Sequence, residues 1–148
     1  MENENKINDV VNCFNNRLAN YILKIDDGDF LKVHFALFKL DLDLKGLEML
    51  IVSYFLNTWR ISRENGWIDT ENNIYFLANR EKLAMLFNST RQTMTKVIKN
   101  LESKNIIQVK RNKGQANAYY FTINFFEKLI KLIELEKELK NTKKTQDW

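Results

Sequence analysis

Apolar residues recur at spacings of three and four near the start of the chain, which is the pattern of an amphipathic helix. Within residues 5–23 this stripe consists of Ile7, Val10, Val11, Phe14, Leu18, Tyr21 and Ile22. The run Asp26-Asp27-Gly28-Asp29 then breaks the pattern and lacks the further oxygen ligands of a calcium loop, so it predicts a turn. Residues 30–40 alternate only weakly and predict an extended or irregular segment.

A second helical pattern predicts the central helix of the core. Asp41 or Asp43 is the predicted N-cap, and the helix is expected to run to about Trp59. Its apolar positions cover much of its surface: Leu44, Leu47, Leu50, Ile51, Tyr54, Phe55 and Thr58. Residues 60–73 are polar and contain the turn signals Asn65-Gly66 and Asp69-Thr70.

Two short helices separated by a tight turn are predicted next. Residues 74–77 favour a short strand, and a helix over about 80–87 would bury Leu83, Ala84, Leu86 and Phe87. Asn88 makes the turn. Ser89 followed three residues later by Gln92 is typical of a capping box, which would open a helix ending near Lys104-Asn105. The buried stripe of that helix is Met94, Val97, Ile98 and Leu101.

The last third of the sequence predicts a hairpin and a final helix. Residues 106–110 and 118–123 favour strands, joined by a loop in which Gly114 and Asn117 tolerate positive φ. A helix over about 125–140 carries Phe126, Leu129, Ile130 and Ile133, and its apolar surface is extended by Leu132, Leu135 and Leu139. A Lys-rich tail follows.

This order of elements predicts a winged helix-turn-helix. The fold class is mainly α with a small β-hairpin (α+β), with extra N- and C-terminal helices. The expected organisation is an N-terminal amphipathic helix and turn over 1–28, the winged helix-turn-helix over 29–124, and a C-terminal helix with a basic tail over 125–148.

Charge is concentrated in one part of the chain. The 148 residues carry a net charge of +4, but residues 89–117 hold seven basic side chains against the single acid Glu102, a net charge of +6. The remaining residues therefore sum to −2. By charge alone, a polyanion-binding face and a solvated lysine-rich surface are equally good interpretations.

Helical geometry separates these two interpretations. If the apolar stripe of residues 89–104 faces the core, Arg91, Gln92, Thr95, Lys96 and Lys99 face outward. Arg can pair with guanine, Gln with adenine, and Thr with a thymine methyl, whereas the lysines suit phosphates. The sequence therefore favours a recognition helix that reads double-stranded DNA.

The hairpin of residues 106–123 would be the wing. Polar side chains cluster at its tip, and Arg111 is the candidate for insertion into a minor groove. An exposed hairpin with ordinary solubilising charges is the alternative. The full candidate set for DNA binding is Ser89, Thr90, Arg91, Gln92, Thr95, Lys96, Lys99, Lys110, Arg111, Asn112, Lys113, Gln115 and Asn117.

Other chemistries find little support. The single Cys13 and single His34 exclude a disulfide framework and most metal or triad sites, and both are expected to be core or half-buried residues. Trp59 and Trp67 are expected to be packing anchors rather than a platform for stacking bases. We expect no enzyme activity, no cofactor and no metal. No apolar run approaches the roughly 18 residues of a membrane span, so we expect a soluble cytoplasmic protein.

Residues 62–123 resemble a known family. The run Ser62-Arg63-Glu64-Asn65-Gly66-Trp67-Ile68-Asp69 is similar to an "S-x-x-N-G-W-x-D" loop, and residues 80–83, 86–89, 97–102 and 105–107 follow the same family pattern. Residues 111–120, with Gly114, Asn117 and Tyr120, are similar to its wing, although Ala116 replaces a proline and Ala118 a basic residue. The family is the N-terminal winged-helix domain of the RepA_N plasmid replication initiators of low-GC Gram-positive bacteria.

The resemblance implies a DNA-binding protein of a plasmid or mobile element that binds repeats at a replication or transfer origin. We expect a homodimer, with plasmid replication or transfer proteins as further partners. A plasmid transcriptional repressor and a winged-helix protein-interaction module remain the alternatives. Such initiators usually continue into a second domain, so we expect a stand-alone module that works alone, beside or instead of a full initiator.

Overall fold

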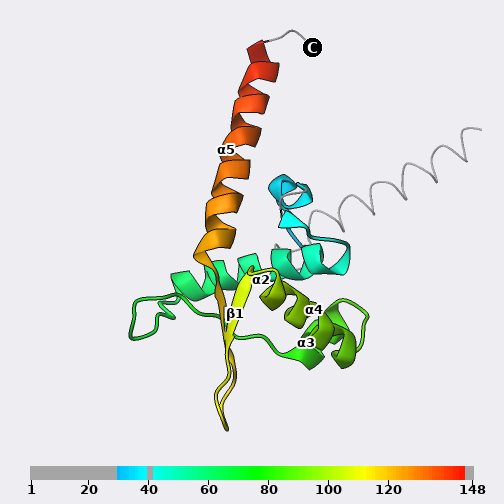
Figure 1. Ribbon diagram of the computed structural model, residues 1–148, viewed down its shortest axis with the longest axis vertical. Coiled ribbons are helices and arrows are strands. Elements are labelled where there is room, and N and C mark those ends of the chain that lie inside the picture. The colour runs from blue at the N-terminus through cyan, green and yellow to red at the C-terminus, as the bar shows by residue number, and fades with distance from the viewer. Residues whose placement is uncertain (1–29, 40–41, 146–148) are drawn as a thin grey trace, which may run out of the picture. The chain divides into compact units, whose positions relative to one another are not determined.

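The computed structural model describes residues 30–39 and 42–145 (Figure 1). The predicted helix over 5–23, the turn at 26–29, and the residues Cys13 and Asp41 lie outside this part of the chain. Contacts divide the chain into two units, Met1–Leu31 and Lys32–Trp148, and the elements below belong to the second.

The second unit has the predicted mixture of helices and one small hairpin, so the fold class is confirmed. Figure 1 shows the hairpin descending from the base of the long last helix, with α3 and α4 to one side of it. In chain order the elements are η2 (a 3-10 helix, Phe35–Phe38), α2 (Leu47–Glu64), α3 (Arg80–Leu86), α4 (Arg91–Ser103), β1 (Ile107–Lys110), β2 (Ala118–Phe121) and α5 (Ile123–Thr145). None of the described helices is long and apolar enough to cross a membrane.

An aromatic cluster holds the hairpin against α2. The Phe76 ring lies 5.1 Å from Phe55, 5.7 Å from Tyr119 and 5.3 Å from Phe121, measured between ring centroids. The Phe76 amide donates to the carbonyl of Tyr119 at 3.0 Å, and the Tyr119 amide returns a bond at 2.9 Å. Residues 74–77 do not form the predicted strand. They contribute two isolated bridges instead, one from Phe76 to Tyr119 and one from Ile74 to Ile68.

The helix α3 and the turn after it follow the prediction closely. The Asn79 side chain accepts bonds from the amides of Glu81 and Lys82 and so caps the helix. Asn88 has a φ of 49°, which makes the predicted turn. Leu83 and Ala84 are buried, but Leu86 is 55% exposed, so its assignment to the inner face is wrong. Leu86 is the last residue of this seven-residue helix, and its side chain lies at the surface.

The helix α4 begins one residue later than predicted, because Thr90 and not Ser89 is its N-cap. Thr90 has extended backbone, and its Oγ1 accepts a bond from the Thr93 amide at 3.2 Å. Ser89 instead closes the preceding turn by donating its amide to Ala84 at 2.8 Å. The capping box with Gln92 is therefore wrong. The buried stripe is confirmed in full: Met94, Val97, Ile98 and Leu101.

The predicted start of α2 is wrong. The helix begins at Leu47 after Gly46, which has a φ of 47°, and no side chain caps it. Asp43 lies four residues before the first helical residue and has a φ of 49°, so it does not cap the helix. The core helix also continues past the predicted end at Trp59 to Glu64.

The helix α5 is longer at both ends than predicted. Phe125, which the sequence pattern missed, is buried, whereas Ile130 of the predicted stripe is exposed. The Thr122 hydroxyl accepts a bond from the Phe125 amide at 3.1 Å, which lets the helix start directly after β2. His34 is exposed rather than half-buried, because its Nδ1 accepts the Ala36 amide at 3.0 Å and so caps η2 at the surface.

We predict that Phe76→Ala lowers the free energy of unfolding by about 3–5 kcal/mol, because it removes the centre of the aromatic cluster. Its neighbour Leu77 is 40% exposed, so Leu77→Ala is expected to cost less than about 1 kcal/mol. Urea unfolding of the two variants measures the difference. Equal losses would show that Phe76 does not hold the hairpin.

Candidate nucleic-acid interface

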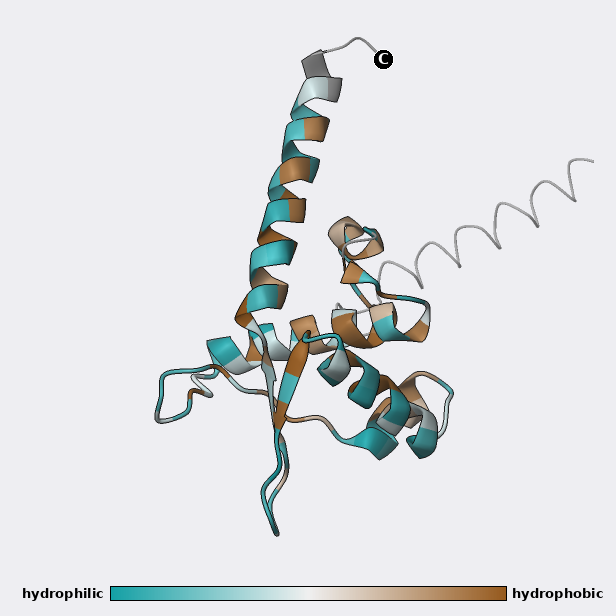
Figure 2. Cartoon of the chain, in the orientation of Figure 1, coloured by the Kyte–Doolittle hydropathy of each residue, from teal (hydrophilic) through white to brown (hydrophobic). Residues whose placement is uncertain are grey.

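The outer face of α4 presents the side chains that the sequence places there. Because the apolar stripe faces the core, Arg91, Gln92, Lys96 and Lys99 are exposed and Thr95 is half-buried. Figure 2 shows this contrast between the inner and outer sides of the helix. Among the described residues, no carboxylate lies within 4 Å of Lys96 or Lys99.

The Thr95 hydroxyl has no hydrogen left to donate. Its Oγ1 donates to the Arg91 carbonyl at 3.0 Å and accepts from Nη1 of Arg80 at 3.2 Å. A hydroxyl has one hydrogen and two lone pairs, so Thr95 offers an outside partner its methyl group and one acceptor position. The hydroxyl of Thr90 is likewise occupied by the N-cap bond and by Thr93.

Arg80 is a residue of this surface that the sequence pattern missed. With Arg91 it lines a cavity of about 520 Å³ between α3, α4 and the base of the hairpin, where Asn117 and Tyr119 form the other wall. Arg80 stands 15 residues before Thr95, and neither spacing nor composition brings them together. Locally, the sequence shows only that Arg80 is the first residue of α3, which does not indicate its contact with Thr95.

Arg91 is only weakly restrained. Its Nη1 lies 3.7 Å from Oε1 of Glu81, and both side chains are well exposed. Exposed pairs of this kind contribute little to stability because water screens them and both chains lose freedom. Arg91 therefore remains available to an external partner.

The loop of the hairpin is closed by its own polar groups. Gly114 has the predicted positive φ of 74°, but Asn117 does not, so that prediction is wrong. The Asn117 side chain instead accepts the Asn112 amide at 3.4 Å, and the Asn112 side chain donates to Ala116 at 3.4 Å. Lys110, Lys113 and Gln115 are left exposed, as the sequence predicts for the wing.

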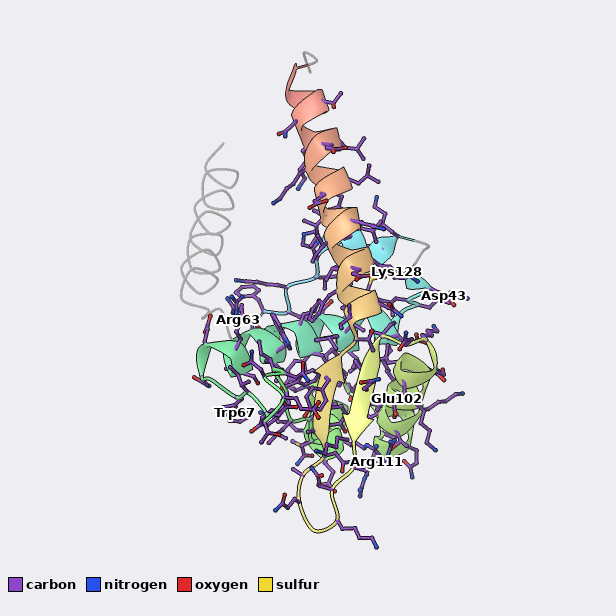
Figure 3. The ribbon with its side chains drawn as sticks, turned by 60° about the vertical axis from the view of Figure 1, so that its left-hand side comes forward. Asp43, Arg63, Trp67, Glu102, Arg111 and Lys128 are labelled. Carbon is purple, nitrogen blue, oxygen red and sulfur yellow. The ribbon has the colours of Figure 1, made fainter. Side chains whose placement is uncertain are left out.

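Arg111 has an acidic partner on α4. Its Nη2 lies 2.9 Å from Oε1 of Glu102 and its Nη1 lies 3.4 Å from Oε2, a two-point contact that raises the pKa of the guanidinium. Figure 3 shows Glu102 above Arg111, at the point where the hairpin loop follows β1. The structure thus joins the end of α4 to the base of the wing.

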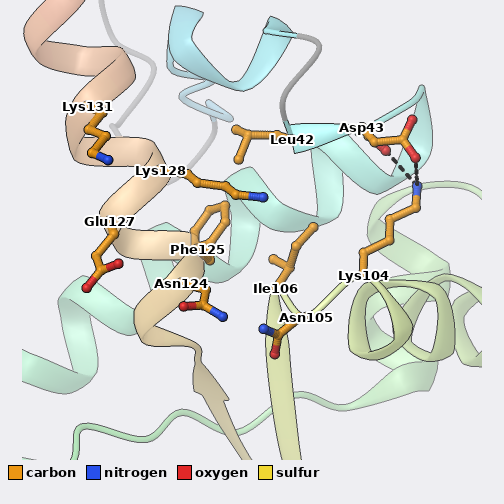
Figure 4. Close-up of a pocket in the computed structure, with 10 residues that line it drawn as sticks. All are labelled: Leu42, Asp43, Lys104, Asn105, Ile106, Asn124, Phe125, Glu127, Lys128 and Lys131. Atoms are coloured by element: carbon orange, nitrogen blue, oxygen red, sulfur yellow. Dashed lines mark hydrogen bonds and ion pairs between the residues drawn. The ribbon is translucent and has the colours of Figure 1, made fainter.

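Lys104 belongs to the basic stretch in the sequence but turns away from the wing. Its Nζ lies 2.6 Å from Oε2 of Glu48 and donates to the Asp43 carbonyl at 2.6 Å. Figure 4 shows Lys104 directed toward Asp43 at the edge of a cavity of about 450 Å³ beneath α5. Within the described residues, the basic side chains of 89–117 without a carboxylate inside 4 Å are thus Lys96, Lys99, Lys110 and Lys113.

Asp69 ties the loop after α2 to the wing. Its Oδ1 accepts the amides of Glu71 and Asn73, each at 2.9 Å, and its Oδ2 accepts the Tyr120 hydroxyl at 3.0 Å. The bond from Asn73, with those from Tyr120 and Glu71, lowers the pKa of Asp69. Burial, together with the bond to Asp69, raises the pKa of Tyr120. Two segments that carry the family resemblance, the loop and the wing, are therefore in contact.

The two tryptophans pack against other rings. Trp59 lies 5.1 Å from Phe126, and Trp67 stacks on Tyr75 at 6.1 Å with an interplanar angle of 22°. Trp59 packs against the core, as expected of a packing anchor, whereas Trp67 is 41% exposed and packs only on the loop ring of Tyr75. In the part of the chain that the structure describes, no three His, Cys, Asp or Glu side chains gather as a metal site.

Comparison with known proteins gives a consistent result. A family model described as "Replication initiator protein A (RepA) N-terminus" matches residues 29–141. A solved structure described as "Structure of Rep-DNA complex" is 26% identical, with a TM-score of 0.54 over 73% of this chain and 86% of that chain. Another, "N-Terminal domain of DNA binding protein", gives the same values.

A third solved structure, "Structure of MDR initiator", is 27% identical, with a TM-score of 0.50 over 69% of this chain and 87% of that chain. No curated protein sequence matches the chain.

We predict that Tyr120→Phe lowers the melting temperature near neutral pH, because it removes the hydroxyl that donates a hydrogen bond to Asp69. The lowered pKa of Asp69 means that its ionised form stabilises the fold above its ordinary pKa, and that this contribution is lost as the pH falls through the lowered value. The difference between wild type and variant should therefore shrink in acid. Thermal unfolding followed by circular dichroism at a series of pH values measures it, and a pH-independent difference would contradict the role of Asp69.

Proposed function

This chain belongs to the RepA_N family of replication initiator N-termini, and we propose that it binds double-stranded DNA at repeats of a plasmid origin through α4 and the wing. One observation carries the proposal: the outer face of α4 and the wing together present four lysines that have no carboxylate within 4 Å among the described residues. The similarity to the solved structure described as a Rep–DNA complex supports DNA as the ligand.

The side chains divide into two roles. Lys96, Lys99, Lys110 and Lys113 are long, exposed and unpaired by acids, so they suit the phosphate backbone. Arg91 and Gln92 lie in the first turn of α4 and have the donor patterns that read guanine and adenine edges in a major groove. Asn112, Gln115 and Asn117 of the wing and Ser89 before the helix complete the proposed surface.

The cavity that Arg80 and Arg91 line lies between the two reading elements. We include Arg80 in the binding surface, since it lines that cavity and its guanidinium is held by the Thr95 hydroxyl of α4. Arg80 has five donors and uses one on Thr95, so others remain for a phosphate oxygen.

Selection of bound fragments tests the function directly. The full chain is mixed at physiological salt with sheared DNA of the source cell, and the recovered fragments are sequenced. Recovery of one short repeated motif supports the proposal, and its position beside a replication origin, a transfer origin or a promoter separates an initiator or transfer factor from a repressor. A recovered population identical to the input would overturn it.

We predict that Lys99→Gln reduces the slope of log affinity against log salt by about 0.9, the value for one lost phosphate contact. Lys104→Gln is the matched control, since it removes the same charge from the same basic stretch but from a side chain held by Glu48. Its slope should match wild type. Titrations of a selected duplex at several salt concentrations measure both slopes, and equal slopes for the two variants would contradict the assignment of Lys99.

We also propose a homodimer, because α5 carries more apolar surface than its contacts use. Leu135 and Leu139 are 49% and 51% exposed, although Phe125 and Leu129 on the same helix are buried. Two copies would match two half-sites of a repeated DNA element. The same apolar surface is what a protein-interaction module would use.

We predict that Leu135→Ser with Leu139→Ser converts the dimer to a monomer in sedimentation velocity. Removing the whole of α5 would be a poorer test, because Phe125 and Leu129 belong to the core. Ile123→Ser is the control, since Ile123 is an exposed apolar residue at the opposite end of α5. A wild-type chain that sediments as a monomer would refute the dimer, and a double variant that stays dimeric would move the interface elsewhere.

A further inference from the structure

Glu102 differs from the other charged residues of the proposed DNA-binding surface because it is negatively charged. It is the single acid among residues 89–117, where seven side chains are basic. A carboxylate near a phosphate backbone weakens binding by repulsion. Its position in the last turn of α4 therefore needs a reason other than attraction to DNA.

The contact of Glu102 with Arg111 crosses from the recognition helix to the wing. Arg111 is the first residue after β1, at the point where the hairpin loop leaves the sheet. The carboxylate meets the guanidinium at two points, 2.9 and 3.4 Å. Such a fork restricts orientation as well as distance.

The strands of the wing are held to the body by Phe76, but its loop, residues 111–117, has few other links to the rest of the protein. The strands are four residues each, and a two-stranded hairpin of this length has little rigidity of its own. On β2 the Tyr120 hydroxyl reaches Asp69. Beyond Arg111, the hydrogen bonds of the described loop residues stay inside the loop. On the side that faces α4, the polar contact between the wing and the rest of the protein is thus the Glu102–Arg111 ion pair.

We propose that Glu102 is a positioning residue, which through Arg111 holds the wing at the angle to α4 that lets both elements contact one DNA duplex. This inference rests on the proposed DNA binding. It explains why an acid stands on a basic surface, because a wing that moves freely loses geometric specificity even if its charges are unchanged. Exposed ion pairs add little to global stability, so removal of Glu102 should leave the protein folded.

Charge and positioning predict opposite effects for Glu102→Gln. If only charge matters, the variant binds every duplex more tightly. If Glu102 positions the wing, affinity for a selected duplex falls about tenfold, while affinity for a scrambled duplex of equal length is unchanged or rises. The control is Glu71→Gln, because Glu71 lines the same cavity as Glu102 and Lys110 but has no basic group within 4 Å among the described residues.

A second measurement follows the wing without DNA. Spin labels at Gln115→Cys on the wing and Lys128→Cys on α5, in a Cys13→Ser background, report the distance between the wing and the body. We expect a narrow distribution for the otherwise unchanged protein, a broader one after Glu102→Gln, and a narrow one again when the charges are exchanged in Glu102→Arg with Arg111→Glu.

The outcomes separate the two proposals. A broader distribution with reduced preference for the selected duplex supports the positioning role. The positioning role is overturned by an unchanged distance distribution, or by a Glu102→Gln variant that binds both duplexes more tightly than wild type. If the wild type shows no DNA preference, the proposed function fails, whereas the label distances still decide whether Glu102 holds the wing.

Discussion

The two backbone hydrogen bonds that Phe76 exchanges with Tyr119 are the constraint on which the arrangement of this protein depends. Between α2 and α3 the chain makes two isolated bridges, and the one at Phe76 reaches the hairpin. The ring of Phe76 then packs on Phe55 from α2 and on Phe121 from β2. A single residue thereby sets the sheet against the central helix.

Acidic side chains organise the basic surface rather than oppose it. Glu102 holds Arg111, Glu48 holds Lys104, and Asp69 holds the wing tyrosine Tyr120. Each pair joins two different elements and gives the cation or hydroxyl a partner within the protein. Within residues 89–117, the lysines without a carboxylate inside 4 Å lie on the outer face of α4 and on the wing. The chain therefore has a modest net charge and still presents a concentrated basic face.

The proposed surface separates attraction from reading. In the proposed complex, phosphate contacts by lysines would supply affinity that falls with salt, and base contacts from the first turn of α4 would supply selectivity. Both depend on the angle between helix and wing, because a rigid duplex must meet them together. The loop that carries the family resemblance is part of this geometry, since its Asp69 is bonded to the wing. The loop of residues 62–69, which carries the family resemblance, therefore supports the wing through the Asp69–Tyr120 hydrogen bond.

The sequence by itself determined the elements whose signals are local. The stripe of Met94, Val97, Ile98 and Leu101 follows from helical periodicity, and the turn at Gly114 follows from the freedom of glycine at positive φ. The winged helix-turn-helix order and the outward residues of α4 could be predicted for that reason.

Only the tertiary structure decided which of these residues are free to bind. Arg80 meets Thr95, Arg111 meets Glu102 and Lys104 meets Glu48 across separations of 15, 9 and 56 residues. Local patterns cannot specify such pairs, because the distance between two side chains on different elements is set by how those elements pack and not by their spacing in the chain.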